Sequence, residues 1–153
     1  HTNSALGSIP RLLDIGVKPD IISGNIIGII AQRLIRSLCT ACKVPYSLGD
    51  MERTLLGLKV TDKQKEIYNA TGCDVCGNDG YKGRIALQEV LHFDTDMDEL
   101  IARKGTQRDL LRMALSKGFS TLADVGARRV LDGTTSLEEM SRVIDLTARL
   151  KTS

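Results

Sequence analysis

The chain has 153 residues, of which 42% are hydrophobic and 26% are charged, and its net charge is +2. A chain of this size and composition can bury a core without disulfide bonds, which argues against a disulfide-stapled scaffold. Aromatic residues make up only 3%, with no tryptophan. Both the stacking platform and the strong basic field of nucleic-acid-binding proteins are therefore missing, and we expect no nucleic-acid partner.

The chain begins with His1, and its first methionine is Met51. We interpret it as a piece of a longer protein, part of whose function depends on upstream sequence. No secretory signal pattern is present, which favours a cytosolic chain with reduced thiols. On composition alone, a leading histidine is more often a boundary than a working residue, and we interpret His92 as structural.

The first part of the chain is predicted to be helical. Ser8–Gly16 is typical of a short helix, with a cap-type serine, a proline in the first turn and a glycine after the end. Asp20–Leu34 is apolar nearly all round and predicts a helix buried against several neighbours. A membrane span is the alternative, but the apolar run Ile21–Ala31 has only eleven residues. Since a span needs about 20, we expect no membrane insertion.

The four cysteines form two C-x-x-C pairs, which are Cys39 with Cys42 and Cys73 with Cys76. Two such pairs can close a tetrahedral four-thiolate site, for which zinc is the expected metal and in which no position stays open for catalysis. The 30 residues between the pairs exceed the usual spacing of about 15–20, so this insert should form a loop or small lobe pinned at its base. Gly77, after the last cysteine, is typical of a knuckle that turns backbone N–H groups towards sulfur.

The rest of the chain mixes short strands and helices. The insert predicts a helix around Asp50–Gly57 and a short strand at Glu66–Asn69, and Arg84–Leu91 has the composition of a strand. Four helix starts follow, each with a hydroxyl residue and an acid three positions later; the first residues are Thr95, Thr106, Thr121 and Ser136. We predict four short helices that pack as a compact helical bundle and carry no chemistry.

A second group of residues suggests phosphate binding. Several glycines between Gly72 and Gly83 accompany Lys82 and Arg84, but the P-loop pattern G-x-x-x-x-G-K-[ST] is absent from the whole chain. Turns around a knuckle explain these glycines better. The sequence leaves open whether three arginines face phosphate or solvent: Arg33, Arg36 and Arg84.

Three segments together resemble the C-terminal part of the type II secretion and type IV pilus assembly ATPases. These are HTNSALGSIPRLLDIGVKP (1–19), IIGIIAQRLIRSLCTACKVPY (26–46) and GCDVCGNDGYKGRIALQEVL (72–91). The most specific elements are the HTN opening, the AQRL-x-R-x-LC junction and the paired C-x-x-C motifs, which in this family form the zinc lobe of secretion and pilus-extension motors. At Arg84–Leu91 the chain departs from the family's usual GR-x-G-I-Y-E-V-L.

The resemblance implies an α+β, helix-rich C-terminal fragment of a RecA-like P-loop ATPase domain. Residues 1–38 would be trailing helices of that domain, 39–83 the tetracysteine lobe, and 84–153 a strand with a terminal helical bundle. It implies structural zinc on Cys39, Cys42, Cys73 and Cys76, ATP and Mg in the parent protein, and a nucleotide-proximal His1. Because the Walker A and Walker B segments are missing, the fragment contains no catalytic residue and should be inactive alone.

The implied parent is a homo-hexameric cytoplasmic motor that docks, at the periphery of the inner membrane, on the platform proteins of a secretion or pilus machine. Two other functions stay open at this point. A zinc-ribbon module for nucleic acid or protein would use the same four cysteines. Thiol–disulfide exchange would need a reactive thiolate of low pKa instead of four metal-bound sulfurs.

Overall fold

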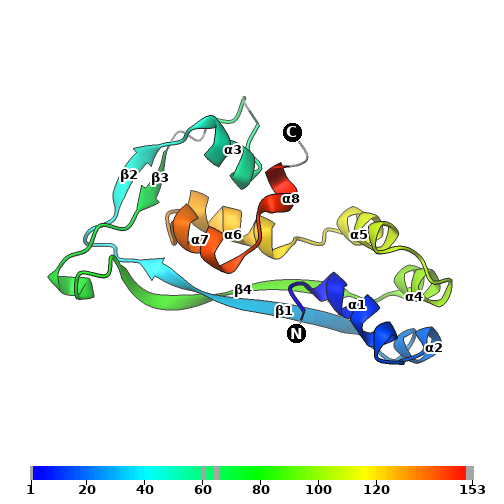
Figure 1. The fold of residues 1–153 in the computed structure, drawn as a ribbon. Coiled ribbons are helices and arrows are strands. Elements are labelled where there is room, and N and C mark those ends of the chain that lie inside the picture. Colours follow the sequence, from blue (N-terminus) through cyan, green and yellow to red (C-terminus); the bar gives the residue numbers. More distant parts are fainter. Residues whose placement is uncertain (1, 60, 64–65, 151–153) are drawn as a thin grey trace. The chain divides into compact units, whose positions relative to one another are not determined.

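The computed structural model describes residues 2–59, 61–63 and 66–150 (Figure 1). In chain order the elements are α1 (Ala5–Asp14), α2 (Pro19–Ile22), β1 (Gly28–Leu38), β2 (Val44–Ser47), α3 (Asp50–Leu56), β3 (Glu66–Asn69), the 3-10 helix η1 (Asp74–Cys76), β4 (Tyr81–His92), α4 (Thr95–Ala102), α5 (Gln107–Ser116), α6 (Leu122–Leu131), α7 (Leu137–Val143) and α8 (Thr147–Leu150). The predicted α+β class is confirmed.

The chain divides into two compact units. The first unit comprises His1–Gln32 and Gln88–Thr121, and the second unit comprises Arg33–Leu87 and Leu122–Ser153. Strands β1 and β4 contribute residues to both units, and they pair as a two-stranded sheet. Among the described residues, no helix has the length and apolar character that crossing a bilayer requires.

The helix predicted over Asp20–Leu34 is wrong beyond Ile22, where α2 ends, and the stretch from Gly28 onward belongs to strand β1. Isoleucine is β-branched and favours strands over helices. The burial follows a period of two, with Ala31 buried while its neighbour Ile30 is 63% exposed. Apolar residues on both faces of the strand concealed this period in the sequence, and the short apolar run was then mistaken for a buried helix.

Helices of the first unit pack in pairs, with α1 against α5, α2 against α4 and α4 against α5. Helix α1 begins earlier than predicted, because the hydroxyl of Ser4 accepts a hydrogen bond from the N–H of Gly7 at 3.0 Å and caps the helix there. The buried side chains of this unit are mostly apolar; they include Ile9, Ile22, Met97, Ile101 and Leu110.

The four helices predicted in the last third are present, and Thr106 and Ser136 cap α5 and α7 as expected. Asp94 rather than Thr95 caps α4. Of these helices, α4 and α5 belong to the first unit while α6 and α7 belong to the second, and the predicted helical bundle stays a prediction. The domain limits at 38/39 and 83/84 stay a prediction.

In the second unit, the insert between the two cysteine pairs forms a small lobe, called here the insert lobe (residues 43–72). Strands β2 and β3 pair antiparallel, with Val44 opposite Asn69 and Ser47 opposite Glu66, and α3 lies between them in the sequence. Helix α3 and strand β3 were predicted, whereas β2 was missed. The lobe packs on α6 and α7 through α3 and β3, so its position is fixed within the second unit.

Candidate metal centre

Two tight turns present the four cysteines. The first knuckle (Cys39–Lys43) follows strand β1; the N–H groups of Cys42 and Lys43 donate to the carbonyl of Cys39 at 3.3 and 3.0 Å. The second knuckle (Cys73–Gly80) contains η1 and precedes strand β4; the N–H of Cys76 donates to the carbonyl of Cys73 at 3.1 Å. Each turn places its two sulfurs on the same side, as a metal-binding C-x-x-C pair requires.

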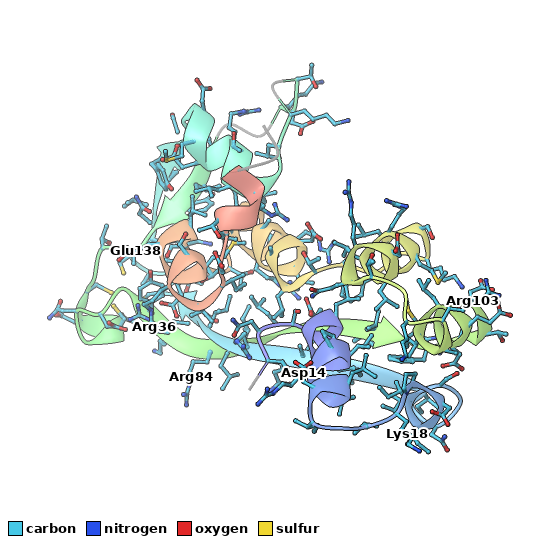
Figure 2. All side chains as sticks on the ribbon, turned by 45° about the vertical axis from the view of Figure 1, so that its right-hand side comes forward. Asp14, Lys18, Arg36, Arg84, Arg103 and Glu138 are labelled. Carbon is cyan, nitrogen blue, oxygen red and sulfur yellow. The ribbon has the colours of Figure 1, made fainter. Side chains whose placement is uncertain are left out.

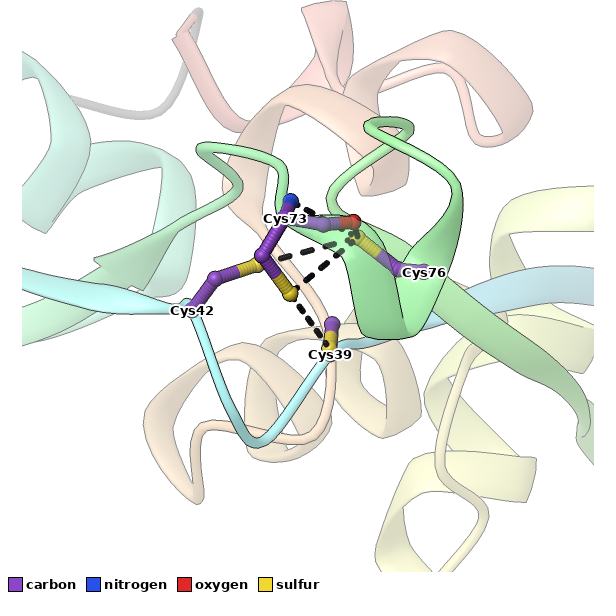
Figure 3. Close-up of side chains that lie close together, drawn as sticks. All are labelled: Cys39, Cys42, Cys73 and Cys76. Carbon is purple, nitrogen blue, oxygen red and sulfur yellow. Dashed lines mark hydrogen bonds between the residues drawn. The ribbon is translucent and has the colours of Figure 1, made fainter.

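The structure brings the four sulfurs together (Figure 3). The Sγ atoms of Cys39 and Cys73 are 4.0 Å apart, and those of Cys42 and Cys76 are 3.8 Å apart. All four sulfurs lie within 4.8 Å of one another, and none is in a disulfide. Four thiolates around a tetrahedral zinc ion, with Zn–S bonds of about 2.3 Å, would be separated by about 3.8 Å. The donor set and its spacing therefore fit zinc.

Backbone N–H groups point at sulfur in the second knuckle, as the sequence predicted. The N–H groups of Cys73 and Gly80 both donate to the Sγ of Cys76 at 3.2 Å. This path needs left-handed backbone at Gly77 (φ 62°) and Asn78 (φ 63°), a region that glycine and asparagine tolerate best. These hydrogen bonds stabilise the charged form of the sulfur.

The pKa values of the second pair move in opposite directions. Burial raises the pKa of the Cys73 thiol to about 11. Burial also acts to raise the pKa of Cys76, but the N–H groups of Cys73 and Gly80 and the neighbouring thiols lower it to about 7. One thiol of the cluster thus ionises readily while another resists, because backbone N–H groups stabilise the Cys76 thiolate whereas burial disfavours the Cys73 thiolate. A cation at the centre would favour the thiolate form of both.

A buried carboxylate lies beside the centre, and sequence reasoning missed it. Glu139, in α7, is only 1% exposed. Arg36 donates to it through Nε (2.9 Å), Nη2 (2.8 Å) and its own backbone N–H (3.0 Å), and Arg142 donates through Nε (3.0 Å) and Nη2 (2.7 Å). Burial alone would raise the pKa of Glu139, but the hydrogen bonds from Arg142 and Arg36 lower it to about 2.

Arg36 also contacts the second knuckle. Its Nη1 lies 3.1 Å from a carboxylate oxygen of Asp79, and its guanidinium lies 4.0 Å from the centre of the Tyr81 ring. The sequence left open whether Arg36 faces phosphate or solvent, and in the structure its guanidinium contacts protein carboxylates and a tyrosine ring instead. Arg84 is exposed on β4, and Figure 2 shows its side chain directed away from the ribbon. Arg33 is half-buried on β1.

Among the described residues, the histidine His92 lies away from this centre in the sequence and is not one of its ligands. His92 is exposed at the end of β4, in the first unit. His1, which the resemblance places near a nucleotide, lies outside the described residues. The prediction for His1 therefore stays a prediction.

Two C-x-x-C turns with their sulfurs at tetrahedral spacing define a class of protein, one with a closed tetracysteine site suited to a structural metal. The family described as Type II/IV secretion system protein matches residues 1–142, and the chain belongs to this family. The predicted resemblance is thus confirmed. The zinc-ribbon alternative is not favoured, because the family match covers nearly the whole chain.

Relatives from both secretion and pilus systems are similar to this chain. Type II secretion system protein E of Pseudomonas aeruginosa is 41% identical over 94% of this chain and 28% of its own length. Type IV pilus assembly ATPase TfpB of Acinetobacter baylyi is 38% identical over 96% of this chain and 25% of its own length. Type IV pilus assembly ATPase PilB of Thermus thermophilus is 37% identical over 95% and 16%. The chain spans between 16% and 28% of these relatives' length.

Proposed function

We propose that this chain is the C-terminal part of an ATPase that drives type II secretion or type IV pilus assembly, and that its four cysteines hold one structural zinc ion. The arrangement of the four sulfurs carries this proposal, because they lie within 4.8 Å of one another on two knuckles that are far apart in the sequence. Family membership supports the motor assignment, since the relatives named above include pilus assembly ATPases.

In this proposal the cysteines close the base of the insert lobe. Within its described part, only Leu56 and Ile67 are fully buried, so the lobe has little apolar core of its own. A metal that joins the first knuckle to the second supplies folding free energy where apolar burial is scarce. The lobe then holds its shape and offers a rigid contact surface to the inner-membrane platform proteins.

The nucleotide chemistry belongs to the parent protein. We infer that ATP and Mg bind to a P-loop outside this chain, since the P-loop pattern is absent here. His1 would lie near the terminal phosphate, in a cytoplasmic homo-hexamer that transmits domain rotation to the growing pilus or pseudopilus. The RecA-like architecture is part of the same proposal.

Metal analysis of the purified chain, handled without oxygen, tests the zinc assignment directly. We expect one zinc per chain, and thiol titration should detect the cysteines only after a chelator is added. Cys73→Ser should lose the metal, whereas Thr40→Ser, which removes one methyl group from the first knuckle, should keep it. Absence of stoichiometric metal in the unmodified chain would overturn the zinc assignment.

The parent ATPase tests the motor assignment independently. Cys73→Ser introduced there should abolish secretion or piliation in cells, and Thr40→Ser should not. If the Cys73→Ser parent loses its metal but still supports secretion or pilus assembly, the lobe is dispensable for the motor and this part of the proposal is wrong.

A further inference from the structure

We propose that Arg36 is a positioning residue that couples metal occupancy of the cysteine centre to the docking of helix α7. This inference rests on the proposed metal, and it adds a route by which the metal affects a helix that carries no ligand. The residues involved all belong to the second unit. The coupling is carried by the contacts of one guanidinium with two carboxylates.

The first carboxylate belongs to the second knuckle. Nη1 of Arg36 lies 3.1 and 3.4 Å from the two oxygens of Asp79. The N–H of Asp79 donates to the carbonyl of Cys76 at 3.4 Å, and the next N–H, of Gly80, donates to the sulfur of Cys76 at 3.2 Å. A shift of this sulfur on metal loss therefore moves the backbone that carries Asp79.

The second carboxylate belongs to α7. Glu139 accepts three hydrogen bonds from Arg36, two from the guanidinium and one from the backbone N–H. Its own N–H donates to the hydroxyl of Ser136, the N-cap of α7, at 3.1 Å, and that hydroxyl is 2.6 Å from the hydroxyl of Tyr81. Arg36 stacks on the Tyr81 ring, so it holds the first turn of α7 from two sides.

The corner between α6 and α7 also contacts both flanks of the first knuckle. The N–H of Leu38, next to Cys39, donates to the carbonyl of Thr134 at 2.8 Å. Nζ of Lys43, next to Cys42, donates to the carbonyl of Gly133 at 2.8 Å. The hydroxyl of Thr135 donates to the carbonyl of Arg36 at 2.8 Å. The same corner (residues 132–136) therefore meets Arg36 and both ends of the ligand-bearing turn.

A guanidinium is suited to this role because it is planar and carries five donors, so it can serve Glu139 and Asp79 at once while stacking on a ring. A lysine ammonium at this position could not make all of these contacts. Coupling between two binding events is reciprocal. If metal binding favours docked α7, then removing the contacts that link α7 to the metal centre must weaken metal binding. The variant Asp79→Ala removes the ion pair between Arg36 and the second knuckle, and it keeps the ion pair between Arg36 and Glu139.

Zinc release to a chromogenic chelator, measured on the full chain, tests the coupling between the metal centre and α7. Because Asp79 and Arg36 are 54% and 34% exposed at their side chains, we expect Asp79→Ala to release zinc roughly two- to fivefold faster than the unmodified chain. The matched control is Asp14→Ala, which removes the same side chain from an exposed position in the first unit (Figure 2). The control should release zinc at the unmodified rate. Equal rates for Asp79→Ala and the unmodified chain would overturn the inference.

Hydrogen exchange in α7 supplies a second readout. If Asp79 only stabilised the metal-binding knuckle locally, its loss would not change amide exchange in α7. Stripping zinc from the unmodified chain should raise amide exchange in Leu137–Val143 as well as around the knuckles. In Asp79→Ala the metal-dependent change in α7 should be smaller, and Arg36→Lys should reduce it further if that variant folds. If α7 exchange does not respond to metal in the unmodified chain, there is no coupling. A chain that binds no zinc would overturn the proposed metal, whereas a zinc-bound chain without these effects overturns only the role of Arg36.

Discussion

The two units of this chain are stabilised by different chemistry. The first unit packs apolar helix faces together and has exposed ion pairs, such as that of Lys117 with Asp96; its buried carboxylate, that of Glu89, accepts a hydrogen bond from the N–H of Ala5 at the start of α1. The second unit places a carboxylate at the interior, with Glu139 almost fully buried between Arg36 and Arg142, and it gathers four thiols. The second unit, which includes a lobe with little apolar core, thus depends on a buried ion-pair network and on its proposed metal, whereas the first unit depends mainly on apolar packing.

Metal removal should separate the two units most sharply. Chelation of zinc from the purified chain is expected to abolish hydrogen-exchange protection across the insert lobe, since the two knuckles would no longer be joined. The first unit contains no cysteine, so α1, α4 and α5 should keep their protection. Mass-spectrometric exchange with and without chelator checks this. Equal loss in both units would show that the chain unfolds as one cooperative body.

Glu139→Gln should have the next largest effect. The substitution leaves two arginines beside an uncharged amide in a buried site, and we expect a loss of about 3 kcal/mol in the free energy of unfolding. Glu138→Gln is the matched control, because Glu138 is the preceding residue of α7 and is exposed; it should change stability by less than about 0.5 kcal/mol. Urea denaturation of both variants measures the difference. Similar losses of unfolding free energy in the two variants would mean that the buried charge of Glu139 contributes no more to stability than an exposed one.

The acid dependence of stability follows from the same carboxylate. The pKa of Glu139 is lowered from an ordinary value of 4.5 to about 2, so the folded state favours the ionised form. Its contribution is fully present above the ordinary pKa and is lost as the pH falls from about 5 towards 2. Urea titrations over this range should show a steeper fall for the unmodified chain than for Glu139→Gln. Parallel curves would contradict the assigned pKa.

The sequence predicted the parts of the fold that depend on local signals. The caps at Thr106 and Ser136 and the spacing of the cysteines depend on residues close in the chain, and the structure places these caps and gathers these sulfurs. The strand at Gly28–Leu38 and the buried ion pair of Glu139 with Arg36 depend on partners far away in the chain, 103 residues away for the ion pair. Glu139 was interpreted only as a capping acid, because nothing in a single sequence shows that the distant Arg36 will join the neighbouring Arg142 around it.

Two glycines with the same backbone conformation sharpen the comparison further. Gly133 (φ +71°) and Gly118 (φ +86°) both follow helices, but a Cβ on Gly133 would lie 2.8 Å from the Tyr68 ring, whereas one on Gly118 would meet nothing within 4 Å. Gly118→Ala should cost about 1 kcal/mol for the left-handed backbone alone. Gly133→Ala should cost about 1–2 kcal/mol more, because the insert lobe must shift. Thermal denaturation measures both, and equal losses would show that Tyr68 moves aside freely.

The smallest effect should come from the exposed ion pairs of the first unit. Lys117 contacts Asp94 and Asp96, and its hydrogen bonds with Asp94 and then Asp96 raise its pKa. Lys117→Met removes the charge but keeps the apolar stem, and Asp94 still caps α4 through the N–H of Met97 at 3.0 Å. We expect a small drop in Tm at low salt that disappears near 1 M salt, because exposed charges are screened. A drop that is large or independent of salt would show that this pair contributes to the first unit as Glu139 contributes to the second.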